Sequence, residues 1–279
     1  HADTRQLAFG DGSPADPSGI LAPLGNALDV VAHEFTHGVT ESTSGLLYVY
    51  EPGGLNEAIS DIFGAYAERK NWLIGEDLYS PTDPYGRKAL RSLADPPLYY
   101  QPDHYFDYQS TLDVHGTSGI INKVGYLLVA GGTHNGITVT GVGYAYAEQV
   151  MYYALDNLLT SSTGFAEFYA SVRQAAQLLV TAGRVPIVTI GAVDSAFNAV
   201  GLGKDTDADG IPDRLETKSG KFDPAKRKIG TGTDPNRFDT DGDGRSDGEE
   251  LLAYYTNPLV SDNKQLWEPP VQLTSALSD

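Results

Sequence analysis

Two short motifs constrain the fold of this chain more than any other feature of its sequence. The motif HEFTH spans residues 33–37, and a second motif, NEAISD, spans residues 56–61. Positions four apart lie on the same face of an α-helix, so the two histidines of the first motif can direct their ring nitrogens to one ion. The carboxylates of the second motif have the same spacing. We therefore expect two helices that meet at a metal site.

The residue types of these motifs predict a catalytic zinc site. Zinc in such sites takes three protein ligands at roughly 2.0–2.2 Å and keeps one position open for water. His33, His37 and Glu57 are the predicted ligands. Asp61 lies one helical turn after Glu57, and we expect it to accept the second ring proton of His33 and so to fix the tautomer of that ligand. These contacts require the two helices to run antiparallel past the ion.

The glutamate inside the first motif suits hydrolysis. Zinc lowers the pKa of its bound water from about 15.7 toward 7 and polarises a carbonyl group. Glu34 is predicted to accept a proton from that water and to pass it to the leaving amine. A match to H-E-x-x-H arises by chance in roughly one chain in a hundred of this composition. The second motif, at this distance, makes coincidence a poor explanation.

The antiparallel pair also predicts a second metal site. Asp29 lies one turn before His33, and Glu68 lies three turns after Glu57, so the two carboxylates should approach each other. An acidic pair of this kind needs a cation, and calcium prefers oxygen ligands. We therefore expect calcium at this end of the helix pair.

Composition and charge exclude several classes of partner. The 279 residues carry a formal net charge of -18 with a pI of about 4.5, which would repel nucleic acid and anionic membrane surfaces. The sequence has no apolar run of about 18 residues that would predict a membrane span. The absence of cysteine excludes disulfides. The chain starts with His1 and shows no signal peptide, so we expect a processed or truncated piece of a monomeric protein that binds cations.

Hydrophobic periodicity predicts a mainly α-helical fold. Helices are expected over residues 27–40, 55–69, 117–130, 143–160, 164–181 and 189–201. The interval 41–54 is expected to be turn and short strand, and residues 71–115 are expected to be irregular. After Gly203 the composition shifts to Asp, Gly, Thr and Lys. We therefore predict a helical domain over residues 1–203 and an acidic tail over residues 204–279.

The tail contains two copies of one acidic pattern. Residues 205–216 and 239–250 both read D-x-D-x-D-G-x-x-D-x-x-E, which offers acidic ligands at loop positions 1, 3, 5, 9 and 12 and a backbone carbonyl at position 7. The predicted calcium ligands of the tail are Asp205, Asp207, Asp209, Ile211, Asp213, Glu216, Asp239, Asp241, Asp243, Arg245, Asp247 and Glu250. A disordered acidic tail is the alternative. Glycine and proline between the copies disfavour a helix-loop-helix pair, and only residues 249–255 could form a short exit helix.

Residues 1–203 resemble the thermolysin-like neutral metalloproteases. The resemblance is carried by residues 10–12, 29–37, 45–48, 56–64, 72–77, 91–93, 102–105 and 114–123. It implies a thermolysin-like helical lobe, with the β-rich N-terminal lobe of the family almost entirely missing, so that half of the cleft wall would be absent. It also implies that Tyr48 and His115 hydrogen-bond the oxyanion of the tetrahedral intermediate, in agreement with the use of preorganised donors at developing charge. Arg91 would bind the substrate backbone after the cleaved bond.

The same resemblance assigns a specificity pocket. Leu24, Val30 and Leu90 match the apolar pocket for the residue that follows the cut, which implies cleavage before bulky hydrophobic residues. Asp113, two residues before His115, is expected to orient the imidazole of that histidine.

The resemblance also bears on calcium. Asp29, Glu68 and Glu76 match the calcium ligands of the family. The chain is several residues shorter between Glu68 and Trp72 than the familiar members, so we expect one calcium ion here rather than a pair.

The tail resembles thrombospondin type 3 repeats, which follow many bacterial secreted enzymes. Loops of this kind fill at extracellular calcium concentrations, which favours a secreted or extracellular protein. The tail could serve as a stiff spacer, a stability clamp or a tether to the cell surface.

These features predict a secreted zinc endopeptidase with one catalytic Zn2+ and several structural Ca2+, acting on protein or peptide substrates. The alternative is a calcium-dependent surface or adhesion protein that carries a truncated, inactive peptidase lobe. The intact Glu34, Tyr48 and His115 favour the enzyme.

Overall fold

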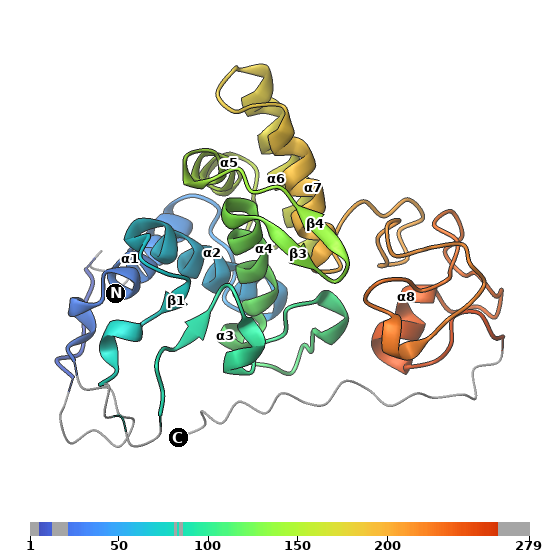
Figure 1. The fold of residues 1–279 in the computed structure, drawn as a ribbon, viewed down its shortest axis with the longest axis horizontal. Coiled ribbons are helices and arrows are strands. Elements are labelled where there is room, and N and C mark those ends of the chain that lie inside the picture. The colour runs from blue at the N-terminus through green and yellow to red at the C-terminus, as the bar shows by residue number, and fades with distance from the viewer. Residues whose placement is uncertain (1–5, 13–21, 81–82, 84–85, 262–279) are drawn as a thin grey trace.

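The computed structural model of the chain describes residues 6–12, 22–80, 83 and 86–261. Within these residues the fold is mainly α-helical, as the periodicity predicted, with two short two-stranded sheets. Figure 1 shows the helices gathered in one lobe and the tail beside it. The last part of the predicted tail, residues 262–279, lies outside the described residues.

The helices of the described residues are α1 Leu28–Ser42, α2 Tyr50–Glu68, α3 Val114–Thr117, α4 Gly119–Ala130, α5 Tyr144–Asn157, α6 Phe165–Thr181, α7 Val188–Ala199 and α8 Asp247–Glu249. The shorter turns are η1 Leu24–Asn26, η2 Glu76–Leu78, η3 Pro96–Tyr99, η4 Tyr105–Asp107, η5 Pro224–Lys226 and the π-helical turn η6 Glu250–Tyr254. The antiparallel pairs are β1 Leu73–Ile74 with β2 Arg91–Ser92, and β3 Gly132–His134 with β4 Ile137–Val139. None of the helices in the described part of the chain is long and apolar enough to cross a membrane.

Helices α1 and α2 form the framework of the metal centre. Asp29 in the first turn of α1 places a negative charge at the positive end of the helix dipole. Most residues of α2 are buried against other elements. The pair approaches closely at Gly64, where a Cβ atom would lie 2.6 Å from the backbone oxygen of Asp29. A larger residue at this position would push the two helices apart, so Gly64 sets their spacing.

The main core lies between α2 and the helices that follow it. α4 packs on α2 with Gly125 against Ile62, where a Cβ atom would lie 2.5 Å from the Ile62 side chain. Phe165, Phe168 and Phe197 of α6 and α7 are fully buried. Each such ring contributes about 1.5–3 kcal/mol when it leaves water. The core therefore holds α2, and with it Glu57, in a fixed position.

The prediction of turn and short strand for residues 41–54 is confirmed only for the turn, which spans residues 43–49. α1 continues into this interval, α2 begins before its end, and the structure has no strand in this stretch. Pro52 is tolerated because the first turn of a helix needs no hydrogen bond from its backbone nitrogens. The glycine pair that follows reads as a turn. A Cβ atom at Gly54, however, would lie 2.3 Å from the Thr117 hydroxyl oxygen, so glycine is present here for close packing.

Other boundaries also differ from the predictions. Residues 71–115, predicted as irregular, contain the β1–β2 sheet and three turns. The hairpin β3–β4 was not predicted. Its turn is formed by Asn135 and Gly136, with φ angles of 45° and 75°, and an Asn-Gly pair is the sequence signal for such a turn. The predicted helix 117–130 is divided at Ser118 into α3 and α4, and the predicted exit helix is present as α8 and η6.

The two acidic repeats adopt the same local structure. The first aspartate of each loop, Asp205 or Asp239, accepts hydrogen bonds from the backbone N–H groups three and five residues later, at 2.7 to 2.9 Å. The glycine at position 6 has a left-handed backbone in both loops, with φ of 98° at Gly210 and 100° at Gly244. Glycine adopts this conformation without steric cost. The repeated sequence therefore encodes one loop structure twice.

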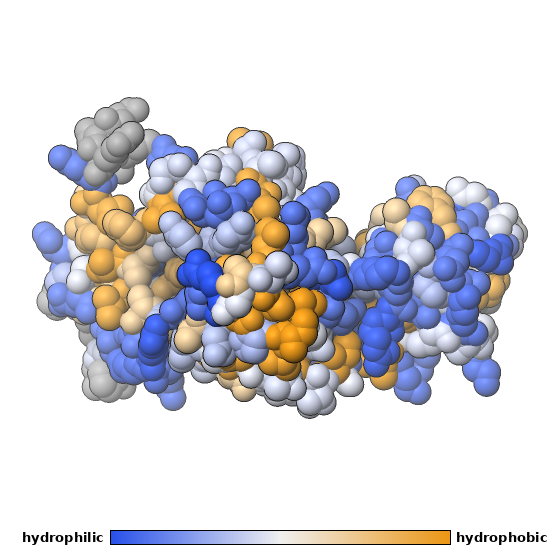
Figure 2. Space-filling model, turned by 90° about the horizontal axis from the view of Figure 1, so that it is seen from above, coloured by the Kyte–Doolittle hydropathy of each residue, from blue (hydrophilic) through white to orange (hydrophobic). Residues whose placement is uncertain are grey.

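The tail packs on the lobe through a side chain that the lobe contributes. Phe106 in η4 is 2% exposed and lies in a small hydrophobic cluster with Leu215 and Leu251 of the tail. Next to it, Asp107 accepts a hydrogen bond from Arg227 at 2.9 Å. Figure 2 shows hydrophobic patches on the lobe, whereas the tail surface in this view is mainly hydrophilic. The buried apolar side chains of the tail thus enclose Phe106, whereas others, such as Ile229 and Phe238, are exposed.

Replacing Phe106 by Ala should loosen the tail. Loss of a buried aromatic side chain costs about 3–5 kcal/mol, and the buried neighbours in this cluster belong to the tail. We expect trypsin to digest the tail of F106A faster than that of the parent chain, with helical content unchanged by circular dichroism. Phe238→Ala removes a ring that is 52% exposed and serves as the control. Equal protease resistance of the two variants would show that the tail does not depend on this contact.

Candidate metal centre

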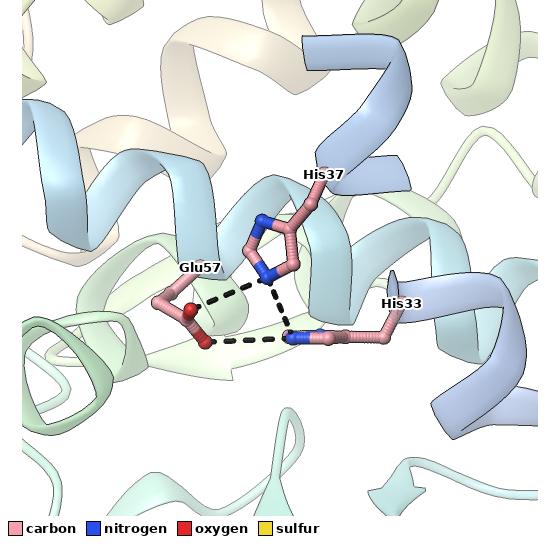
Figure 3. Close-up of side chains that lie close together, drawn as sticks. All are labelled: His33, His37 and Glu57. Atoms are coloured by element: carbon pink, nitrogen blue, oxygen red, sulfur yellow. Dashed lines mark hydrogen bonds and ion pairs between the residues drawn. The ribbon is translucent and has the colours of Figure 1, made fainter. Parts of the chain in front are cut away.

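Three donor groups from α1 and α2 converge on one point, as Figure 3 shows. The Nε2 atoms of His33 and His37 lie 3.0 Å apart. The Glu57 carboxylate oxygens lie 3.5 Å from the first of these atoms and 3.3 Å from the second. Ligands of a tetrahedral zinc ion lie about 3.3 Å from one another at bond lengths near 2.0–2.1 Å. The separation and the chemical types of these donors therefore fit zinc.

Each histidine is oriented through its other ring nitrogen. Asp61 Oδ1 lies 2.9 Å from His33 Nδ1. Asn56 Oδ1 lies 2.8 Å from His37 Nδ1, and Ser60 Oγ lies 3.1 Å from the same atom. These partners direct both Nε2 atoms at the metal position. Asn56 and Ser60 were not predicted, although their spacing of four residues within the NEAISD motif is a signal that they share a helix face.

The Asp61 carboxylate is itself held by three groups. Besides His33, it accepts two hydrogen bonds from the Arg91 guanidinium, both at 2.7 Å, and one from the Asn122 amide at 2.8 Å. Burial raises the pKa of Asp61, but Arg91 and His33 outweigh burial and hold this pKa well below its usual range. The structure therefore places Arg91 on Asp61. Its predicted contact with substrate stays a prediction, and no local sequence signal indicates Asn122.

The Glu57 carboxylate is 1% exposed and ionised. Burial raises the pKa of Glu57, but the hydrogen bond from His37 and the positive charges of His33 and Arg91 lower it to about 2. The Tyr48 hydroxyl donates a hydrogen bond to Oε1. Oε2 is buried and accepts no hydrogen bond from the described residues. A buried anionic oxygen without a donor, beside two imidazoles, is the arrangement that a divalent cation completes.

A pair of donors, the His115 imidazole and the Tyr48 hydroxyl, faces the metal ligands. His115 Nε2 lies 3.3 Å from the Tyr48 hydroxyl and 3.5 Å from Glu57 Oε1. Asp113 Oδ1 lies 2.5 Å from His115 Nδ1, so the carboxylate fixes the ring orientation. Burial raises the pKa of Asp113, but its bonds to His115 outweigh burial and lower it. The structure thus brings Tyr48, His115 and Asp113 to the same side of the site.

These groups surround an open cavity of about 420 Å³. Its lining comprises His33, Glu34, His37, Glu41, Gly45, Leu46, Tyr48, Asn56, Glu57 and His115. Glu34 lies on the exposed side of α1, next to a metal ligand, where it faces the open volume. The predicted specificity residues Leu24, Val30 and Leu90 are not part of this lining and pack in or against the core instead. Their assignment stays a prediction.

A larger cavity, of about 710 Å³, lies between α2 and α5. Its lining includes Tyr66, Tyr152 and the ion pair between Arg69 and Glu148. It contains no group of three metal-ligating side chains among the described residues. Size alone therefore does not identify the site, and the donor atoms of the smaller cavity do.

Comparison with protein families decides the relationship. Residues 44–202 match the model of the thermolysin metallopeptidase alpha-helical domain, and residues 1–41 match that of the thermolysin metallopeptidase catalytic domain. The chain belongs to the thermolysin metallopeptidase family. Residues 239–261 match the bacterial TSP3 repeat, which covers the second acidic loop of the tail.

Individual relatives agree with this assignment. The chain is 46% identical over 204 residues to bacillolysin of Brevibacillus brevis and 44% identical over 201 residues to neutral protease B of Bacillus subtilis (strain 168). Each match covers 71% of this chain and 36% of the relative. A solved structure, the precursor of protealysin from Serratia proteamaculans, matches with a TM-score of 0.55 and 32% identity over 70% of this chain and 62% of that chain. This thermolysin-family chain therefore spans about a third of the length of its curated relatives.

The lobe of this thermolysin-family chain has a second cluster of donors. One carboxylate oxygen each of Asp29, Glu68 and Glu76 lies within 4.8 Å of the others. Asp29 accepts hydrogen bonds from the backbone N–H groups of Val30 and Gly75. Burial and the nearby carboxylates of Glu76 and Asp29 raise the pKa of Glu68 to about 7. The structure thus brings together the three predicted calcium ligands of the lobe.

The structure also groups most of the predicted ligands of the tail. The clusters of three carboxylates are Asp205, Asp207 and Asp209; Asp239, Asp241 and Asp243; and Asp209, Glu216 and Asp247. The Glu250 carboxylate is fully buried and accepts a hydrogen bond from the Thr256 hydroxyl at 2.9 Å. The Ile211 side chain lies in the tail core, and the Arg245 guanidinium lies 4.4 Å from the centre of the Tyr254 ring. Any metal contact of these two residues would have to come from the backbone.

Asn56→Ala should weaken zinc binding. Loss of a group that orients a ligating histidine typically lowers metal affinity by about 10- to 100-fold, and Asn56 bonds the ring of His37. We expect a corresponding rise in the zinc dissociation constant, measured by competition with a chromogenic chelator. Asn157→Ala, at the exposed end of α5, is the matched control. Equal zinc affinity in both variants would contradict the orienting role.

Calcium should matter more to stability as the pH rises. The pKa of Glu68 is raised from 4.5 to about 7 in the folded chain. Without calcium the folded state therefore binds a proton that the unfolded state has released, and stability falls as the pH rises between these values. Calcium replaces that proton. We expect the melting-temperature gap between calcium-saturated and calcium-free samples to widen from about pH 5 to pH 7.

Zinc would be held constant in this experiment, and Glu68→Gln is the control because it removes the titrating group. The variant should show a smaller change of the gap with pH than the parent chain. A gap that does not change over this range in the parent chain would contradict the role of Glu68.

Proposed function

We propose that this chain is the catalytic lobe of a zinc-dependent endopeptidase that cleaves protein or peptide substrates. The observation that carries the proposal is the convergence on one cavity of two imidazoles and a carboxylate at zinc-ligand spacing, Glu34, and the pair Tyr48 and His115. Membership of the thermolysin metallopeptidase family supports it. The chain covers 36% of the length of its curated relatives. That the chain is active by itself is therefore part of the proposal.

Zinc bound by His33, His37 and Glu57 would polarise the substrate carbonyl and acidify a water molecule. Glu34, which lines the open side of the cavity, would accept the proton of the attacking water and return it to the leaving nitrogen. A group that performs both proton transfers must stay within reach of the water oxygen and of the leaving nitrogen. The position of Glu34 on α1, one residue after a metal ligand, supports this role.

Tyr48 and His115 would stabilise the charge that develops on the carbonyl oxygen. Asp113 accepts from Nδ1 of His115 and so orients the ring with Nε2 toward Tyr48 and the cavity, where Nε2 donates when both ring nitrogens carry a proton. Burial and the neighbouring Glu57 carboxylate raise the pKa of Tyr48 far above its ordinary value, which keeps the hydroxyl protonated as a donor. Donors fixed before the reaction are worth about 2.7–4 kcal/mol each in hydrolases.

The finer parts of the proposal concern substrate and location. Leu24, Val30 and Leu90 support cleavage before bulky hydrophobic residues through the family resemblance, and Arg91 supports a contact with the substrate backbone. We propose that the protein is secreted, because its calcium loops suit extracellular calcium concentrations. We also propose that it is a monomer. Calcium in the lobe and in the tail would be structural, and the tail could hold the enzyme at a cell surface.

Glu34→Gln is the decisive variant. The amide cannot accept the proton, so we expect hydrolysis of casein to fall by about 10²- to 10⁴-fold with zinc content unchanged. Glu41→Gln is the matched control, because Glu41 lines the same cavity on the same helix without adjoining a metal ligand, and it should retain activity. A zinc-loaded parent chain no more active than E34Q would refute the enzyme and leave the calcium-dependent surface protein as the better interpretation.

A further inference from the structure

The two acidic repeats meet at a buried group of three carboxylates. Asp209 and Glu216 belong to the first repeat, and Asp247 belongs to the second. One oxygen of each lies within 4.8 Å of the others. The three residues are 7%, 4% and 0% exposed, respectively. This group is therefore the most deeply buried of the three acidic clusters in the described part of the tail.

Position 9 of the loop differs between the repeats. In both loops this aspartate accepts a hydrogen bond from the backbone N–H of the threonine at position 2, at 2.7 Å for Asp213 and 2.8 Å for Asp247. Asp213 is partly exposed and pairs with Lys204 at 2.7 Å. Asp247 is fully buried and faces the first repeat. In the first repeat, the charge of the aspartate at this position is neutralised by a lysine. In the second repeat, the aspartate lies beside two more carboxylates.

Three of the buried oxygens of this cluster lack hydrogen-bond donors among the described residues, whereas both oxygens of Asp247 accept from Thr240. Oδ2 of Asp209 and both carboxylate oxygens of Glu216 accept no hydrogen bond in the described part of the chain. None of the ion pairs found among the described residues involves Asp209, Glu216 or Asp247. Burying an unpaired carboxylate costs several kcal/mol. Three of them at one point therefore call for a cation.

The backbone contact between the repeats supports this arrangement. A Cβ atom at Gly248 would lie 2.0 Å from the backbone oxygen of Asp209. Glycine at this position allows the start of α8 to lie directly on the first loop. The contact therefore brings Asp247, the preceding residue, to the first repeat.

We propose that Asp209, Glu216 and Asp247 bind one calcium ion that belongs to both repeats, with Asp247 as a ligand that the second repeat contributes to the ion of the first. The donor set consists of carboxylate oxygens alone, which suits a hard cation, and oxygens up to 4.8 Å apart match calcium–oxygen bonds of about 2.4 Å on opposite sides of an ion. This inference deepens the proposed calcium binding of the tail and rests on it.

A shared ion makes the repeats interdependent. Calcium that is bound only within its own loop would leave the repeats coupled by packing alone, through Leu215 and Leu251 and through the contact at Gly248. An ion bridging the loops instead transmits a change in the second repeat to the first. A substitution at Asp247 should therefore expose the chain around Arg214 and Lys218, which lie in or after the first loop.

The test compares Asp247→Asn with Asp213→Asn in the full chain. Both variants remove the charge at position 9 and keep an oxygen that can accept from the threonine N–H, while D213N also breaks the ion pair with Lys204. Calcium binding would be measured with radiocalcium by flow dialysis, with calcium as the sole added ligand. Trypsin cleavage at Arg214 and Lys218 would be followed by mass spectrometry across the same calcium range.

The shared site predicts that D247N loses one high-affinity calcium ion, or binds it at least about tenfold more weakly, and is cut in the first repeat at calcium concentrations that protect the parent. D213N, whose carboxylate pairs with Lys204 and lies outside the clusters of three carboxylates, should lose less calcium and less protection than D247N. Unchanged binding by D247N, or an equal loss in both variants, would overturn the shared site, because position 9 would then act only within its own loop.

Gly248→Ala provides an independent test because it changes no ligand. Its Cβ atom would push the second repeat away from Asp209, so it should reproduce the calcium loss of D247N. Normal calcium binding by G248A would count against the shared site. A parent tail that binds no calcium would instead refute calcium binding by the tail as a whole, and it would leave the zinc-dependent hydrolysis, measured separately, untouched.

Discussion

The buried carboxylate of Asp61 joins the elements that form the metal centre. It contacts His33 of α1, Arg91 of β2 and Asn122 of α4, while it belongs to α2 itself. Loss of one partner from a buried ion pair costs about 3–5 kcal/mol, because the remaining charge is left without compensation. The orientation of a zinc ligand and the attachment of the β1–β2 sheet thus depend on the same group. Folding of this region and assembly of the metal centre are in this sense one event.

Helical periodicity was sufficient to predict the contacts between α1 and α2. The spacing of His33, Glu57 and Asp61 required an antiparallel pair, and the same geometry placed Asp29 near Glu68; the structure contains both contacts. These predictions succeeded because each helix fixes the relative positions of its own residues over several turns. Once two contacts between two rigid helices are known, the remaining contacts between the same helices follow.

Contacts from distant segments could not be predicted in this way. Asn122 and the guanidinium of Arg91 reach Asp61 from separate elements whose positions depend on the whole core. The specificity residues, such as Leu90, were assigned by resemblance alone, and the structure does not bring them to the cavity. In the tail the sequence repeat predicted two equal loops, yet Asp213 and Asp247 differ in burial. The burial of a loop residue depends on which other segments pack on the loop, and the sequence pattern of the loop does not indicate this.

The short turn η4 holds two neighbouring side chains that face different parts of the protein. The Tyr105 hydroxyl donates to Glu51 Oε1 at 2.7 Å, and the other oxygen of that carboxylate accepts from the backbone N–H of Phe165. The next residue, Phe106, is enclosed by the tail. Removal of the tail would therefore uncover an apolar ring on a turn that the lobe holds in place. The shortened lobe would expose this ring to water, so the tail also serves as the cover of an apolar side chain of the lobe.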